Sequence, residues 1–201
     1  MNQELLFPEL ARSISMFPPG LRYKTGFLSE GEEQALTAAL SKLPLKPFEF
    51  HGYIGNRRVL SFGLRYDYSR REIEVAEEPP SFLRDLRDRI AEFTGHYARE
   101  FRQIGINEYR PGAGIGWHKD KPEFGDVVGV SLLSSVKMRF RKRSGSSWVR
   151  SSQLLEPRSI YILTGEVRRD WEHSIAAVSS LRYSLTFRTL ANGAVKKLPL
   201  R

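Results

Sequence analysis

The sequence predicts an α+β domain whose C-terminal half is a β-sandwich or barrel. Before residue 100, apolar residues recur at helical spacing in two segments. After residue 101 they alternate with polar residues, which is the pattern of half-buried strands. Short strands that follow two helices, with turn signals between them, are typical of such a domain. The apolar fraction of 40% is sufficient for a hydrophobic core.

We expect three segments along the chain. Residues 1–25 form an irregular arm, because prolines interrupt any helix or strand pattern there. Residues 26–100 hold the helices, and residues 101–195 hold the strand-rich core. A length of 201 residues suits one structural domain, which we expect to cover residues 26–195.

Two helices are expected in the N-terminal half. Ser29 and Glu32 have the spacing of a capping box, and apolar residues then recur at helical intervals, which predicts a helix over 30–43. A second apolar stripe, with charged residues on its other face, predicts a helix over 82–93 that ends at Gly95. The segment between these helices is rich in aromatic residues and is expected to be extended.

The second half reads as strands. A basic hairpin is expected over 136–149, where apolar residues alternate with Lys and Arg up to a turn of Ser and Gly. Further strands are expected over 126–133, 159–164 and 182–190.

The charge of the chain indicates the class of partner. Lys and Arg number 32 against 23 Asp and Glu, which gives a formal net charge of +9 and a pI near 9.9. Such a balance favours polyanions, most often nucleic acid and next an anionic membrane surface, although a plain surface preference for Arg would give the same number. The absence of Cys excludes disulfides, thiolate zinc sites and iron–sulfur clusters.

No targeting or membrane-spanning segment is expected. The first 25 residues contain acidic residues and no long apolar stretch, unlike a secretory signal or a transit peptide. No stretch reaches the ~18 continuous apolar residues of a membrane span. We therefore expect a soluble, monomeric, intracellular protein, cytoplasmic with the nucleus left open, and no membrane partner.

Two histidines and one carboxylate predict a metal site. His118 and Asp120 are two residues apart, so in an extended segment their side chains share one face, and His173 follows further along the chain. Two His and one carboxylate are the facial triad of non-haem Fe(II) oxygenases. Zinc could take the same three ligands together with a water molecule.

The strand over 182–190 separates these two interpretations. Alternation puts Arg182, Ser184, Thr186 and Arg188 on one face and apolar residues on the other. Two arginines that lean toward each other could hold a short dicarboxylate, which a hydrolytic zinc enzyme would not need. The alternative is an exposed polar edge strand.

Four local motifs occur in one order: Asn107-x-Tyr109-x-x-Gly112, His118-x-Asp120, His173, and Arg182 followed six residues later by Arg188. In order and spacing they resemble the AlkB family of Fe(II)/2-oxoglutarate dioxygenases. The resemblance covers residues 105–190. It implies a double-stranded β-helix, or jelly-roll barrel, with two supporting N-terminal helices and a substrate lid within residues 26–100.

The resemblance also implies the ligands of the cofactors Fe(II), 2-oxoglutarate and O2. His118, Asp120 and His173 would hold the iron. Arg182 would anchor the distal carboxylate of 2-oxoglutarate, and Arg188 would lie nearer its chelating end. The remaining cosubstrate residues would be Asn107, Tyr109 and Ser184.

The activity that the resemblance implies is oxidative demethylation of N-alkylated bases in DNA or RNA, a direct repair of alkylation damage. The alternative is a 2-oxoglutarate-dependent hydroxylase or demethylase of a protein. The segment 63–69 is similar to the substrate lid of the family, so Tyr66 or Tyr68 would contact the target nucleotide, unless both are ordinary strand aromatics. The phosphate contacts would include Arg57, Arg58 and Arg141.

Overall fold

Two β-sheets and three α-helices make up the computed structural model, which describes residues 17–50 and 52–193. In the larger sheet the strand order is β1-β10-β7-β12-β5-β3-β2, with β4 paired to β3, and in the smaller it is β6-β11-β8-β9. The strands of the larger sheet are β1 (Leu21–Lys24), β2 (Lys46–Phe50), β3 (Tyr53–Asp67), β4 (Glu72–Val75), β5 (Gln103–Tyr109), β7 (Phe124–Leu132), β10 (Ser159–Leu163) and β12 (Arg182–Leu190). Those of the smaller sheet are β6 (Ile115–His118), β8 (Val136–Ser144), β9 (Ser147–Leu155) and β11 (Glu172–Ile175).

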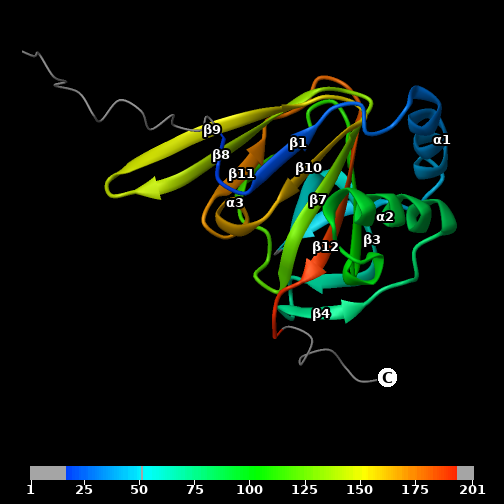
Figure 1. Cartoon of the computed structure of the whole chain (residues 1–201), viewed down its shortest axis with the longest axis horizontal. Coiled ribbons are helices and arrows are strands. Elements are labelled where there is room, and N and C mark those ends of the chain that lie inside the picture. The colour runs from blue at the N-terminus through cyan, green and yellow to red at the C-terminus, as the bar shows by residue number, and fades with distance from the viewer. Residues whose placement is uncertain (1–16, 51, 194–201) are drawn as a thin grey trace, which may run out of the picture.

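The two predicted helices are confirmed and lie on one side of the molecule (Figure 1). Helix α1 (Glu30–Leu40) begins at the predicted capping box, where the Ser29 amide donates to the Glu32 carboxylate at 2.7 Å, and it ends three residues before the predicted end. Helix α2 (Ser81–Thr94) ends at Gly95, whose φ of 82° is the left-handed conformation that favours glycine. A short helix α3 (Gly165–Arg169) and a 3-10 turn η1 (Ala98–Glu100) were not predicted.

The main hydrophobic core lies between α1, α2 and the larger sheet. It contains the apolar row of β12, which is Tyr183, Leu185 and Phe187, as the alternation predicts. The opposite face of β12 therefore turns toward the smaller sheet, and it carries Arg182, Ser184 and Thr186.

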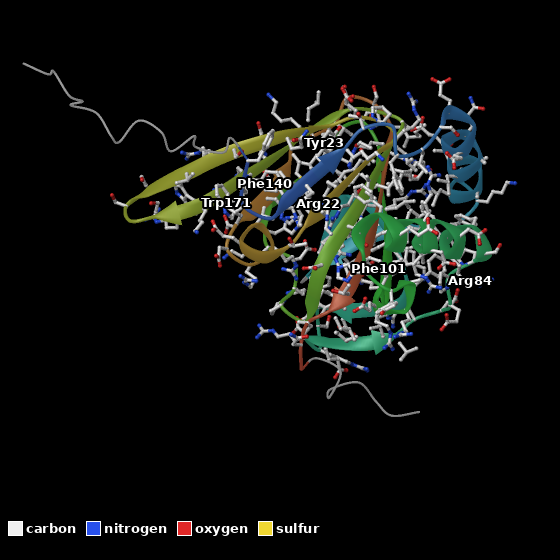
Figure 2. All side chains as sticks on the ribbon, in the orientation of Figure 1. Arg22, Tyr23, Arg84, Phe101, Phe140 and Trp171 are labelled. Atoms are coloured by element: carbon white, nitrogen blue, oxygen red, sulfur yellow. The ribbon has the colours of Figure 1, made fainter. Side chains whose placement is uncertain are left out.

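The two sheets also pack against each other. A second cluster joins Met138 and Phe140 of the smaller sheet to Tyr161 and Leu163 of the larger one, with Trp171 beside them. Figure 2 shows Phe140 and Trp171 at the base of the β8–β9 hairpin.

The predicted basic hairpin is confirmed as β8 and β9, which pair along their whole length and turn at Gly145. It projects from the body of the molecule, away from α1 and α2 (Figure 1). Strands β6 and β11, four residues each, were not predicted, although they carry two of the expected metal ligands. Among the described residues, no helix is both long enough and apolar enough to span a bilayer.

Candidate active site

His118, Asp120 and His173 come together although His173 lies far from the other two in the sequence. Strands β6 and β11 are antiparallel neighbours, and their register places His173 directly opposite His118. The centroids of the two imidazole rings are 4.3 Å apart. Asp120 follows β6 by two residues, and its Oδ2 lies 3.6 Å from His173 Nε2.

Both imidazoles are held in the state that can ligate a metal. The Nδ1 of His118 lies 2.9 Å from the Gly116 carbonyl oxygen, so it donates there and leaves Nε2 as the free acceptor. Burial lowers the pKa of His118, and burial together with the neighbouring His118 lowers the pKa of His173 to about 3. The two rings are therefore neutral at physiological pH.

The Asp120 carboxylate is oriented by Arg188. Its Oδ1 accepts from Arg188 Nη2 at 2.9 Å and from Nε at 3.1 Å, which leaves Oδ2 on the side of His173. Burial by itself would raise the pKa of Asp120, but the positive charge of Arg188 keeps it below its usual value. The guanidinium is fixed in turn, because Arg188 Nη1 donates to Gln103 and to Thr186, both at 2.9 Å.

This donor set suits Fe(II), which accepts neutral imidazole and carboxylate ligands. In the part of the chain that the structure describes, no three His, Asp or Glu side chains already meet around one point as metal ligands.

Arg182 provides the second test of the cofactor assignment. Its side chain is fully buried, and its Nε donates to Ser131 Oγ at 3.2 Å. Neither Nη has a hydrogen-bond partner within the described residues, although both are buried. A buried cation without a counter-charge is costly, so this position fits a bound anion such as a carboxylate. The guanidinium lies 5.2 Å from the Tyr109 ring centroid.

A cavity between the two sheets is lined by most of the predicted site residues, although Arg182, which lies behind Tyr109, is not part of its wall. The apolar part of its wall includes Val127, Met138, Leu163 and Ile175. Arg57 reaches into the cavity from β3, where its Nη1 donates to the amide oxygen of Asn107 at 3.2 Å. The predicted residues that line the cavity are Arg57, Asn107, Tyr109, His118, Asp120, His173, Ser184 and Arg188.

Tyr161 also lines the cavity, and the sequence analysis missed it because it sits in the apolar run of β10. Burial raises the pKa of Tyr161 to about 12, against the opposing charge of Arg182. Its ring packs on Gly129, where a Cβ atom would lie 2.1 Å from the ring. Glycine at 129 is therefore needed to keep the phenol in the cavity wall.

Arg168 is a second residue that the sequence analysis missed. It comes from α3, and its guanidinium donates to four carbonyl oxygens of the segment 120–125, which includes the loop after β6 and the first two residues of β7. The acceptors are Asp120 at 3.3 Å, Lys121 at 2.7 Å, Phe124 at 2.6 Å and Gly125 at 2.6 Å. Arg168 is thus a positioning residue for the Asp120 backbone.

Replacing Arg168 with lysine is expected to weaken Co(II) binding by roughly 10–100-fold, the range found when groups that orient a metal ligand are lost. A lysine keeps the charge but lacks the planar fork that serves four carbonyls. Titration of the metal-free protein with Co(II), followed by visible absorption, measures the change. The matched control is Arg169→Lys at the exposed neighbouring position. Equal Co(II) affinity in the two variants would contradict the positioning role.

An aromatic cluster stands near the cavity, in the region expected to form the lid. The Tyr68 ring contacts Tyr66 and Phe48 edge-on, with centroids 5.2 Å and 5.4 Å away. Lys121 lies over both tyrosine rings, and the Arg57 guanidinium lies 4.0 Å from the Phe48 centroid. Burial raises the pKa of Tyr68, and Arg188 and Arg57 act on it in the opposite direction. Tyr68 is therefore close to the charged groups of the site.

The structure does not bring Arg58 and Arg141 to the cavity. Arg58 follows Arg57 on β3, so its side chain points to the opposite face of the sheet, where it pairs with Glu108 at 2.6 Å. Arg141 lies on the smaller sheet and pairs with Glu172 of β11. Neither Arg58 nor Arg141 is therefore part of the cavity wall.

The Glu108 cluster predicts a stability that depends on pH. Hydrogen bonds from Arg58, Tyr183 and Arg110 lower the pKa of Glu108 from 4.5 to about 2. A lowered folded-state pKa stabilises the protein above about pH 4.5, and this contribution is lost as the pH falls toward 2. At 1.36 kcal/mol per pKa unit it is on the order of 3 kcal/mol.

Urea unfolding of Glu108→Gln tests this expectation. The variant should be less stable than the unchanged protein at pH 6, and the difference should shrink at pH 3, whereas Glu92→Gln on the exposed side of α2 should show no such change. A difference in free energy of unfolding that is the same at both pH values would contradict it.

Comparisons with known proteins agree with this geometry. A family model described as "2OG-Fe(II) oxygenase superfamily" matches residues 20–188. The chain is 29% identical to the "Alkylated DNA repair protein ALKBH8 homolog" of Arabidopsis thaliana over 87% of its own length and 59% of the relative. It is 29% identical to the mouse "tRNA (carboxymethyluridine(34)-5-O)-methyltransferase ALKBH8" over 81% of its length but only 25% of that protein. The chain thus spans only part of both relatives.

One solved structure supports the fold alone. "The structure of OsALKBH1" superimposes with a TM-score of 0.63 at 18% identity, over 86% of this chain and 98% of the other. Together with the two facing sheets, this match confirms the predicted double-stranded β-helix.

Proposed function

Since the chain belongs to the 2OG-Fe(II) oxygenase superfamily, we propose that it removes alkyl groups oxidatively from base nitrogens in nucleic acid. It is an AlkB-like dioxygenase that uses Fe(II), 2-oxoglutarate and O2. The observation that carries the assignment is the buried Arg182 guanidinium, whose two Nη atoms have no hydrogen-bond partner among the described residues, near a cavity lined by His118, Asp120 and His173. The names of relatives, which refer to alkylated DNA and to tRNA, support the substrate class.

When bound, Fe(II) and 2-oxoglutarate allow O2 to be split, with one oxygen atom going into succinate and CO2 leaving, and the other going into a C–H bond of the alkyl group. His118, Asp120 and His173 would hold the iron. Arg182 would bind the distal carboxylate of the cosubstrate, beside Tyr109 and Ser131.

The remaining residues of the site orient the metal-binding carboxylate and shield the reacting centre from water. Arg188 keeps one carboxylate oxygen of Asp120 occupied, so that the other faces His173. The apolar wall of Val127, Met138 and Leu163 limits the access of water to the reacting centre. A base must leave its stack to reach such a site, and Tyr66 and Tyr68 would receive it on their ring faces.

The test compares three methylated substrates, namely DNA, RNA and a methyl-lysine peptide, with unmethylated controls. Loss of the methyl group by mass spectrometry, with formaldehyde and succinate formed in equal amounts, is expected for a nucleic acid and not for the peptide. Activity on DNA would support direct repair of alkylation damage, and activity on RNA alone would indicate RNA modification. Demethylation or hydroxylation of the peptide alone would overturn the proposal in favour of a protein substrate.

A further inference from the structure

Arginine and tryptophan side chains alternate across the smaller sheet, and we call the five residues the Arg–Trp ladder. Arg139, Arg141 and Arg143 come from β8, Trp117 from β6 and Trp148 from β9. Arg139 and Arg141 lie 5.2 Å and 4.5 Å from the Trp117 ring centroid. Arg141 and Arg143 lie 4.3 Å and 5.3 Å from that of Trp148. The order in space is therefore Arg139, Trp117, Arg141, Trp148, Arg143.

The Arg–Trp ladder occupies the face of the sheet that turns away from the cavity. Met138 and Phe140, which alternate with its arginines on β8, point inward and are buried in the core. On the neighbouring strand, Arg150 lies opposite Arg141 in the register and is exposed. Strands β8 and β9 contain no Asp or Glu. The ion pair that Arg141 makes on this face is with Glu172 of β11.

Stacking on the Trp rings orients these guanidinium groups for binding phosphate. Like charges directly opposite each other on neighbouring strands repel, as Arg141 and Arg150 do here, so negative charge bound to this face would be stabilising. A guanidinium stacked on an indole ring is fixed in orientation. The Nε atoms of Arg139 and Arg141 already donate to Ser174 and Glu172, so their hydrogen bonds to phosphate oxygens would come from the Nη groups. From Arg139 to Arg143 the row covers about 13 Å at ~3.3 Å per residue, which is enough for several consecutive phosphates.

We propose that the Arg–Trp ladder binds the phosphodiester backbone of a single-stranded nucleic acid outside the active-site cavity. This inference rests on the proposed function, because it assigns a second contact surface to the same substrate class. The position of Trp117 supports it, since the next residue on β6 is His118, whose side chain lines the cavity. A strand held along the hairpin would thus be led to the edge of the site.

An anionic membrane is the less favoured partner for this face. A membrane-binding hairpin would present free aromatic or aliphatic side chains at its tip. Here both Trp rings are covered by arginines, the turn from Ser144 to Ser147 is polar, and the exposed Val149 alternates with Trp148 and Arg150 and so lies on the other face of the hairpin. The row of arginines in the Arg–Trp ladder suits the consecutive phosphates of a nucleic-acid backbone better than a membrane surface.

The experiment measures binding of a fluorescein-labelled, unmodified 20-mer of dT by anisotropy at several NaCl concentrations. The first variant is Arg141→Gln with Arg143→Gln. The second, Arg143→Gln with Arg150→Gln, changes two exposed side chains and leaves the Glu172 pair intact. The matched control, Lys42→Gln with Arg84→Gln, removes the same charge from exposed positions on the helix side, where Figure 2 shows Arg84 far from the hairpin.

Each lost phosphate contact should reduce the slope of log K against log[salt] by about 0.7, so we expect a reduction of about 1.4 and roughly 25-fold weaker binding at 0.1 M salt. The control should keep the slope of the unchanged protein. Slopes that stay unchanged in both ladder variants would overturn the proposal. So would variants that lose binding to phosphatidylserine vesicles while they keep binding to the 20-mer.

The two proposals fail in distinguishable ways. If the unchanged protein binds the 20-mer through the Arg–Trp ladder but demethylates no base, the proposed function is wrong and the binding surface stands. If it demethylates a base and the ladder variants keep its salt slope, only the binding surface is wrong.

Discussion

Replacing Arg182 with methionine is expected to abolish tight binding of 2-oxoglutarate and, at the same time, to stabilise the protein in the absence of ligand. The first effect follows because both Nη atoms, which lack a hydrogen-bond partner in the described part of the chain, would donate to the distal carboxylate. Hydrogen bonds to charged groups contribute about 1.5–3 kcal/mol each, so the KM for 2-oxoglutarate should rise at least ~100-fold.

The gain in stability follows from the cost of the buried charge. Arg182 is fully buried, and an apolar side chain of similar length removes an uncompensated cation from the core. We expect the free energy of unfolding to rise by on the order of 1–3 kcal/mol without ligand, and the thermal shift that 2-oxoglutarate produces to disappear.

Thermal unfolding with and without 2-oxoglutarate, together with succinate formation, measures both effects of this change. Arg182→Lys is the control, since it keeps the charge and should retain part of the affinity. A methionine variant that is less stable than the unchanged protein and still binds 2-oxoglutarate normally would show that Arg182 is only structural.

The parts of the fold that could be predicted from sequence are the long elements, in which a hydrophobic pattern repeats several times. The alternation along β8 and β12 correctly separates inward from outward residues, because nine-residue strands repeat the pattern several times. Strands β6 and β11 have four residues each, which is too short for a period to be recognised. Their antiparallel pairing, which places His118 opposite His173, is a tertiary feature that no local pattern contains.

The candidate site shows the same division. Residue types and spacing predicted His118, Asp120 and Arg182, and the structure places the first two in the cavity wall and Arg182 in the core beside Tyr109. For Arg58 a signal existed and was not used, since two neighbouring residues of a strand cannot face the same side and Arg57 already faces the cavity. Arg168 had no signal at all, because its four acceptors are backbone carbonyl oxygens, which every residue has.

Asp120→Asn is expected to reduce metal affinity far more than Arg188→Gln does. Arg188 donates to Oδ1 of Asp120, so in the variant the amide oxygen of asparagine must occupy that position. The NH2 group then replaces Oδ2, the atom that faces His173 Nε2, and it offers hydrogens where a lone pair is needed. Loss of a ligand atom should cost more than the 10–100-fold typical of losing a group that only orients a ligand.

Arg188→Gln removes only an orienting group, because it keeps the Asp120 carboxylate and removes the cation that holds it in place. We expect Co(II) affinity to fall by roughly 10–100-fold in Arg188→Gln and beyond detection in Asp120→Asn, whereas Asp85→Asn on the exposed face of α2 should match the unchanged protein. Co(II) absorption titrations establish the order. If Arg188→Gln weakened Co(II) binding more than Asp120→Asn, the cation rather than the carboxylate would be the essential group, and Asp120 would not be a metal ligand.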